Sequence, residues 1–75
     1  MGLHYRSSMS LDTVRWTVSH DEARVVCVER PAGAHVEVHV TFSDLPIATR
    51  RCADTAEAAR YSDELRRAWE AAGWK

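Results

Sequence analysis

Residues 35–42 have the sequence HVEVHVTF, and the fold depends on whether they form a helix or a strand. In a helix, two histidines four positions apart lie one turn apart on the same face and can share a zinc ion. Here, however, apolar residues occupy every second position, which is typical of a half-buried antiparallel strand: Val36, Val38, Val40 and Phe42. At about 3.3 Å per residue, His35 and His39 are then roughly 13 Å apart, too far to share one ion. The sequence therefore predicts a strand with a solvated polar face, and the alternative is a metal site built from one histidine, Glu37 and ligands of a neighbouring strand.

The segments before this strand also have a period of two. Val14, Trp16 and Val18 alternate with polar residues, which predicts a first strand with one buried face. Residues 23–30, ARVVCVER, form a second strand that is apolar on both faces at its centre. One side carries Val25 with Cys27, the other Val26 with Val28, and the sequence does not decide which pair faces outward. One of the two pairs needs cover other than water, which comes either from a binding partner or, in the alternative, from the N-terminal leader.

Turn residues connect these strands and introduce a fourth. SHDE ends the first strand, and RPAG suits a type I turn between the second and third strands, with Pro31 at its second position. After SDLP, residues 47–52, IATRRC, are expected to form an edge strand whose arginines discourage aggregation. The result is a meander of four antiparallel strands.

The period then changes to 3.6, which predicts a C-terminal helix. Asp54 and Glu57 fit an N-terminal capping box, and Gly73 suits a left-handed residue after the last turn. Trp74 would then reach back to Trp69, as in a Schellman motif. One stripe of the helix is apolar: Ala58, Tyr61, Leu65, Ala68, Trp69 and Ala72.

These elements predict an α+β fold of order ββββα, a four-stranded antiparallel meander sheet with the C-terminal helix packed on one face. With 75 residues there is room for one domain, assigned to residues 11–75, after a flexible leader at residues 1–10. The expected core is Val14, Trp16, Val18, Val36, Val38, Val40, Phe42, Tyr61, Leu65 and Trp69.

Composition narrows the classes of function. Ten Lys and Arg balance eleven Asp and Glu, for a formal net charge of −1, so no overall field draws the chain to nucleic acid or to an anionic membrane. No apolar run reaches the roughly 20 residues needed to span a bilayer, and we expect a cytoplasmic protein. Cys27 and Cys52 are too far apart in sequence for a CxxC module and are expected to be buried small apolar residues.

No motif predicts catalysis. Ser19, His20 and Asp21 have the composition of a catalytic triad, but consecutive turn residues point in different directions. The three glycines stand apart, so there is no phosphate-binding loop. We therefore expect no enzyme, with no catalytic residue, cofactor or metal.

The favoured function is a small protein-interaction module of unknown partner, expected to form a homodimer. The surplus apolar face of the second strand motivates it, since exposed apolar patches mark interaction sites. Trp and Arg dominate such interfaces, and the candidate binding residues are Val26, Val28, Arg50, Arg51 and Trp74. The compact Arg- and Ala-rich chain also looks similar to the many small proteins of high-GC bacteria and their phages, among which stoichiometric inhibitors of larger complexes are common, so a role as such an inhibitor or adaptor is a special case of the same function.

The alternative function is binding of single-stranded nucleic acid. Over roughly residues 12–74, the predicted ββββα order is similar to the topology of Whirly-type and transcriptional-coactivator single-strand DNA binders, a resemblance of topology that implies binding on the sheet. The candidate contacts are Arg15, Arg24, Arg30, His35 and His39. Against this alternative, the polar face of residues 35–42 carries no aromatic ring other than histidine.

Overall fold

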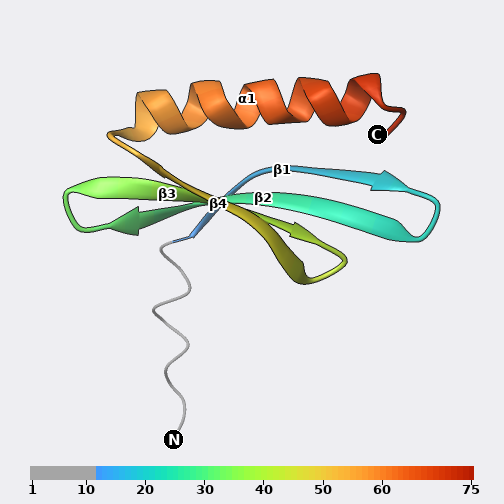
Figure 1. Ribbon diagram of the computed structural model, residues 1–75, viewed down its shortest axis with the longest axis horizontal. Helices are drawn as coiled ribbons and strands as arrows, with labels where there is room; N and C mark the ends of the chain where they lie inside the picture. The colour runs from blue at the N-terminus through green and yellow to red at the C-terminus, as the bar shows by residue number, and fades with distance from the viewer. Residues whose placement is uncertain (1–11) are drawn as a thin grey trace, which may run out of the picture.

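The computed structural model describes residues 12–75, which form one sheet and one helix (Figure 1). The elements are β1 (Thr13–His20), β2 (Ala23–Ala32), β3 (His35–Phe42), β4 (Leu45–Cys52) and α1 (Thr55–Ala71). The strands are antiparallel in the order β1-β2-β3-β4, and α1 lies along one face of the sheet. The predicted ββββα fold is confirmed, whereas the predicted leader at residues 1–10 lies outside the described residues. We call the sheet face that contacts α1 the inner face and the opposite one the outer face.

Three two-residue turns connect the strands. Asp21 in the first turn and both Ser43 and Asp44 in the third have positive φ, which short hairpin turns require. The predicted turn at RPAG is wrong, because β2 continues through Pro31 and the chain turns at Gly33, with φ of 71°. Among the described residues, β1 pairs with β2 only as far as Glu29, so no ladder hydrogen bond to β1 requires an N–H at Pro31.

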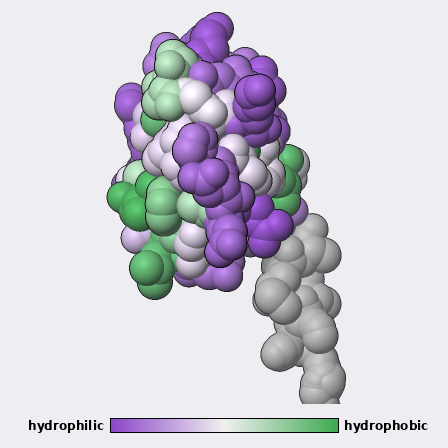
Figure 2. All heavy atoms as spheres, turned by 90° about the vertical axis from the view of Figure 1, so that its right-hand side faces the viewer, coloured by the Kyte–Doolittle hydropathy of each residue, from purple (hydrophilic) through white to green (hydrophobic). Residues whose placement is uncertain are grey.

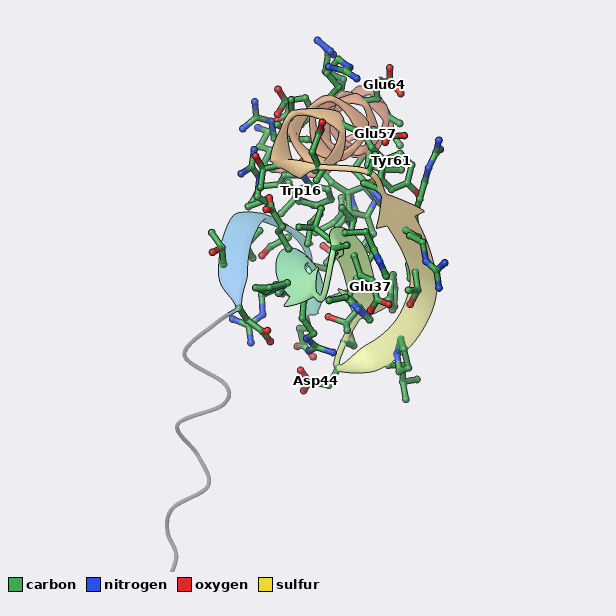
Figure 3. The ribbon with its side chains drawn as sticks, turned by 90° about the vertical axis from the view of Figure 1, so that its left-hand side faces the viewer. Trp16, Glu37, Asp44, Glu57, Tyr61 and Glu64 are labelled. Carbon is green, nitrogen blue, oxygen red and sulfur yellow. The ribbon has the colours of Figure 1, made fainter. Side chains whose placement is uncertain are left out.

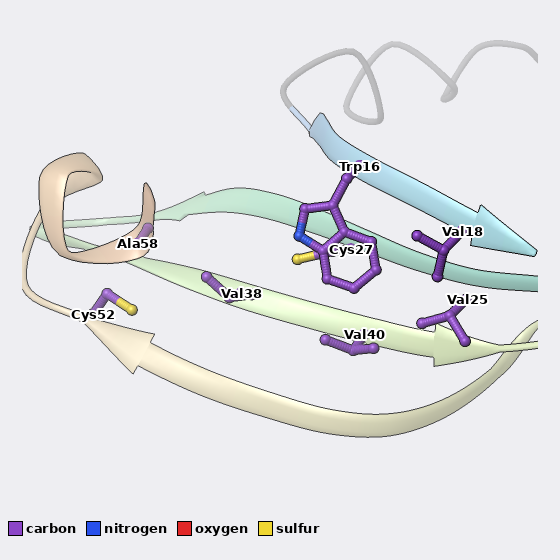
Figure 4. Packing of buried hydrophobic residues seen from close by; sticks show 8 residues of the cluster. All are labelled: Trp16, Val18, Val25, Cys27, Val38, Val40, Cys52 and Ala58. Atoms are coloured by element: carbon purple, nitrogen blue, oxygen red, sulfur yellow. The ribbon is translucent and has the colours of Figure 1, made fainter. Parts of the chain in front are cut away.

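The core lies between the inner face and α1 (Figure 4). Its buried apolar residues are Trp16, Val18, Val25, Cys27, Val38, Val40, Cys52 and Ala58. Both cysteines are buried, as predicted, and neither forms a disulfide. Burial raises the pKa of the Cys27 thiol to about 11. The Trp16 Nε1–H donates to the Ser62 carbonyl oxygen at 2.7 Å, which fixes α1 to β1. The other predicted core residues on β3 and α1 pack against this cluster half-buried.

Val14 is the exception, because a β-bulge turns it outward. The register between β1 and β2 shifts between Val14 and Trp16, so Arg15 is the extra residue. Val14 consequently pairs with Val28 on the outer face and is 61% exposed, so its predicted place in the core is wrong. The bulge also brings the Arg15 guanidinium to 3.2 Å from the carboxylate of the buried Glu29.

The helix begins and ends where the sequence predicts. The Asp54 carboxylate accepts from the Glu57 N–H at 2.9 Å, while Glu57 accepts from the Ala53 N–H at 2.7 Å. At the other end, Gly73 has φ of 102° and the Trp74 N–H donates to the Trp69 carbonyl, which completes a Schellman motif. Trp74 therefore reaches back to Trp69, as predicted, and the centroids of the two rings lie 5.0 Å apart in an edge-to-face arrangement.

Candidate interaction surface

The outer face has an apolar centre on β2. Val26 lies between Thr17 of β1 and Thr41 of β3, and Val28 lies between Val14 and His39. Both β2 valines are half-buried, although α1 lies on the other side of the sheet. Within residues 12–75, this partial cover comes from their neighbours in the sheet and not from a second layer.

A row of alternating charges crosses the outer face next to this centre. The carboxylate of Asp12 accepts two hydrogen bonds from Arg30, both at 3.0 Å, and Arg30 pairs across the sheet with Glu37, which pairs with Arg51. The hydrogen bond from Arg30 holds the pKa of Asp12 below its usual value, and the same bond raises the pKa of Arg30. Arg51 has no such partner within hydrogen-bonding distance among the described residues, although its charge lies close enough to Glu37 to lower the pKa of that carboxyl.

Glu37 lies between two histidines on the same strand. Its carboxylate is 2.8 Å from Nε2 of His39 and 3.9 Å from Nε2 of His35. The hydrogen bond from His39, followed by the charges of both histidines and of Arg51, lowers the pKa of Glu37. The Nε2 atom of His35 is buried and has no hydrogen-bond partner among the residues that the structure describes. The outer face thus concentrates titratable groups on β3.

Thr49, His39 and Glu37 have the connectivity of a catalytic triad. The ionised Glu37 carboxylate can only accept a hydrogen bond, so His39 donates to it from Nε2. The other ring nitrogen of His39, Nδ1, lies 3.4 Å from the Thr49 hydroxyl oxygen, which is long for a hydrogen bond. Acyl transfer also needs donors for an oxyanion and a site that excludes water. Thr49 stands exposed on an edge strand, so its surroundings do not supply that exclusion.

His35 and His39 are four residues apart on the strand β3 and not one turn apart on a helix. Among residues 12–75, no group of three or more His, Cys, Asp or Glu side chains is arranged to hold a metal ion. His35 and His39 lie on one strand, on either side of Glu37, as the period of two predicts.

An acidic hollow opens on the outer face beside the first and third turns. Its volume is about 330 Å³, and it is lined by Ser19, Asp21, Glu22, Ala23, Arg24, Val26, Ser43 and Asp44. Three carboxylates and one guanidinium give this end of the sheet a formal charge of −2. Figure 3 shows Asp44 on the side of the sheet away from α1, with Tyr61 and Trp16 on the helix side.

The edge strand β4 exposes seven of its eight residues, and only Cys52 is buried. Leu45 is 66% exposed and Ile47 is 52% exposed. Figure 2 looks onto the end of the molecule that carries the first and third turns, where hydrophobic atoms gather mainly along one side of a largely hydrophilic surface. On the helix side of β4, the Arg50 guanidinium lies 4.6 Å above the ring of Tyr61.

The five residues predicted to bind a partner do not form one surface. Val26, Val28 and Arg51 share the outer face, since Val25 and Cys27 are the pair that faces α1. Arg50, in contrast, faces the helix side and Trp74 packs at one end of α1, with its ring 5.7 Å from that of Phe42 and 5.5 Å from that of His20.

Four of the five candidate nucleic-acid contacts share one face of the sheet. Arg24, Arg30, His35 and His39 all lie on the outer face, as the pairing of β2 with β3 requires. Arg15, however, is held by Glu29 in the bulge.

Sequence reasoning missed Glu37 and the acidic turns as parts of this surface. The alternation of residues 35–42 already placed Glu37 beside both histidines, but the proximity of the first and third turns depends on the meander order.

No helix of residues 12–75 is long and apolar enough to cross a membrane. No protein-family model, curated protein or solved structure matches the chain.

Proposed function

We propose that this chain is a small, non-enzymatic protein-binding domain that recognises a protein partner through the outer face of its sheet. One observation carries the proposal: Val26 and Val28 form an apolar centre that no other layer of the described structure covers. A rim of arginines and carboxylates surrounds this centre, the usual anatomy of a specific interface.

Such a domain, acting as a stoichiometric inhibitor or adaptor of a larger complex, fits a bacterial or phage setting and a reducing cytoplasm. The two buried free thiols are compatible with that compartment. The homodimer expected from the sequence belongs to the same proposal, because a domain of this size buries only about 60% of the surface of its unfolded chain.

The test is an affinity capture from native lysate with the wild-type chain and two matched variants. Val28→Asp places a charge at the centre of the outer face, and Ala68→Asp places the same charge on an exposed position of α1. We expect one stoichiometric protein to be retained by wild type and Ala68→Asp and lost with Val28→Asp. Equal retention by all three proteins would exclude the outer face as the binding site.

A second candidate, binding of single-stranded nucleic acid, is favoured by the four cationic or titratable side chains on one face: Arg24, Arg30, His35 and His39. Stacking platforms are the usual source of affinity for bases, and among residues 12–75 the outer face carries no Phe, Tyr or Trp. Fluorescence anisotropy with a labelled oligonucleotide at low and high salt tests this candidate. Binding that weakens with salt and with Arg24→Ala, but not with the helix variant Arg67→Ala, would support it over protein binding.

A further inference from the structure

Both edges of the sheet are blocked against pairing with another chain. In β1, the bulge at Arg15 interrupts the strand, and the Lys75 N–H donates to the Ser19 carbonyl near the strand's end. In β4, Pro46 has no N–H and the register shifts again around Ile47. Prolines and bulges are devices that prevent edge-to-edge association. Self-association of this chain is therefore directed away from the edges and toward the outer face.

The two ends of the outer face differ in charge. The residues that line the hollow beside the first and third turns include Asp21, Glu22 and Asp44 against Arg24, a formal charge of −2. At the other end, the formal charges of Asp12, Arg30, Glu37 and Arg51 cancel. Asp12 binds Arg30 there, whereas Arg51 has no hydrogen-bonded partner among the described residues, so the acidic groups of a second copy are repelled at the first end and accommodated beside Arg51 at the second.

A two-fold axis can bring two outer faces together in two ways. If the axis runs parallel to the strands, the same end of each sheet lies over its counterpart in the other copy, so that the two acidic hollows meet and repel. An axis across the strands exchanges the ends, which places Asp44 of each copy over the part of the sheet that holds Arg51 of the other. Like charges brought into contact disfavour an interface, so the second arrangement is the favourable one.

We propose that the outer face binds a second copy of this chain in the ends-exchanged two-fold arrangement, with Val26 and Val28 of both copies at its centre. This inference rests on the proposed function and identifies the partner that occupies the same face. An interface of this kind is isologous, so each attractive contact occurs twice.

The size of the face sets the expected strength. Four strands spaced about 4.8 Å apart, each about eight residues long, present roughly 500 Å² per copy. The total of about 1,000 Å² is at the lower limit for a specific interface. We therefore expect a weak dimer with a Kd in roughly the micromolar range, which weakens further as salt screens its charges.

A mixing experiment tests both the partner and the arrangement. Asp44→Lys and Arg51→Glu each place like charges over one another in their own ends-exchanged homodimer, so each variant alone should dimerise roughly tenfold or more weakly than wild type. In an equimolar mixture, the lysine introduced into one chain faces the glutamate introduced into the other, while the unchanged Asp44 faces the unchanged Arg51. Sedimentation velocity should then show a heterodimer of near wild-type affinity. Glu70→Lys and Arg67→Glu make the same charge changes on exposed positions of α1 and should have no effect.

The residue at position 44 has φ of 70°, so Asp44→Lys also strains the turn. Glu22→Lys, on the neighbouring turn, changes the same acidic hollow without that strain and should also weaken the dimer. Circular dichroism of each variant verifies the fold before it is mixed.

The outcomes separate this inference from the proposed function. Recovery in the mixture supports the ends-exchanged dimer, whereas variants that dimerise weakly alone and in the mixture overturn the arrangement. A wild-type chain that stays monomeric up to the millimolar range overturns the second copy as partner. For a monomeric chain, the affinity capture decides the proposed function. If wild type captures another protein and Val28→Asp does not, the proposed function stands. If wild type and Val28→Asp capture that protein equally, both the proposed function and this inference are overturned.

Discussion

The two faces of the sheet are made from the same strands, yet one is a core and the other a surface. Val25 and Val26 are adjacent on β2 and chemically identical, but Val25 is fully buried and Val26 is half-buried. The difference comes from α1, which packs only on the inner face. Side-chain type therefore determines that β2 is apolar on both sides, while chain topology determines which side becomes the core.

The carboxylates of the two faces show the same contrast. On the inner face, Glu29 is buried and has one guanidinium, that of Arg15, at 3.2 Å. On the outer face, Glu37 lies between two imidazoles and keeps access to water. A buried carboxylate needs a fixed partner because burial penalises its charge, whereas a solvated one can exchange partners. The outer face is thus the side on which charges can rearrange to meet a ligand.

A charge placed on each face should show the largest difference between them. Val25→Asp buries an unpaired carboxylate and should cost more than about 4 kcal/mol, enough to unfold a domain of this size. Val26→Asp, one residue further, should change the free energy of unfolding by less than about 1 kcal/mol. Urea titration followed by circular dichroism measures both. Similar costs for the two substitutions would mean that the outer face is as fully covered as the inner one.

The inner face should also depend on its one buried indole. Trp16→Phe removes the hydrogen bond to the Ser62 carbonyl and leaves a cavity between β1 and α1, at a cost of about 2 kcal/mol. Tyr61→Phe, which only deletes a hydroxyl from a half-buried ring of α1, is the matched control and should cost less than about 0.5 kcal/mol. Equal thermal shifts for both variants would show that the indole does not hold α1 to the sheet.

Much of the inner face could be predicted from sequence because it depends on local periodicity. The alternation of β3 and the helical stripe of α1 each identify one buried side, and the capping residues Asp54 and Gly73 fix the ends of the helix. Local patterns of this kind are independent of which elements become neighbours.

The outer face was less predictable because it depends on register. Val14 belongs to an alternating pattern, but the extra residue Arg15 reverses its orientation, and nothing in the local pattern marks a bulge without knowledge of its partner Glu29. The orientation of Val26 and Val28 likewise required the position of the helix. A shift of one residue exchanges the two faces, so residues on a candidate surface are the least determined by sequence alone.

Cys27, one of the two buried thiols of the inner face whose pKa is raised, should make stability fall at alkaline pH. Burial raises the pKa of Cys27 to about 11, so between its ordinary value near 9 and this value the unfolded chain loses a proton that the folded chain keeps. Stability contributed by this group is therefore complete below pH 9 and declines as the pH rises toward 11, by about 1 to 2 kcal/mol. Urea titrations at about pH 8 and above measure the slope. Cys27→Ala should flatten it, and an unchanged slope in that variant would assign the decline to other groups.

The smallest expected effect tests the bulge itself. Because Val14 points to solvent on the outer face, Val14→Thr should change the free energy of unfolding by less than about 0.5 kcal/mol. Val18 is buried on the inner face of the same strand, where the same substitution places a hydroxyl among apolar side chains and should cost about 1 to 3 kcal/mol. Without the bulge, Val14, Trp16 and Val18 would share one face and both substitutions would be costly. Comparable losses in paired denaturation curves would therefore contradict the register of β1, and with it the presence of Val14 on the outer face.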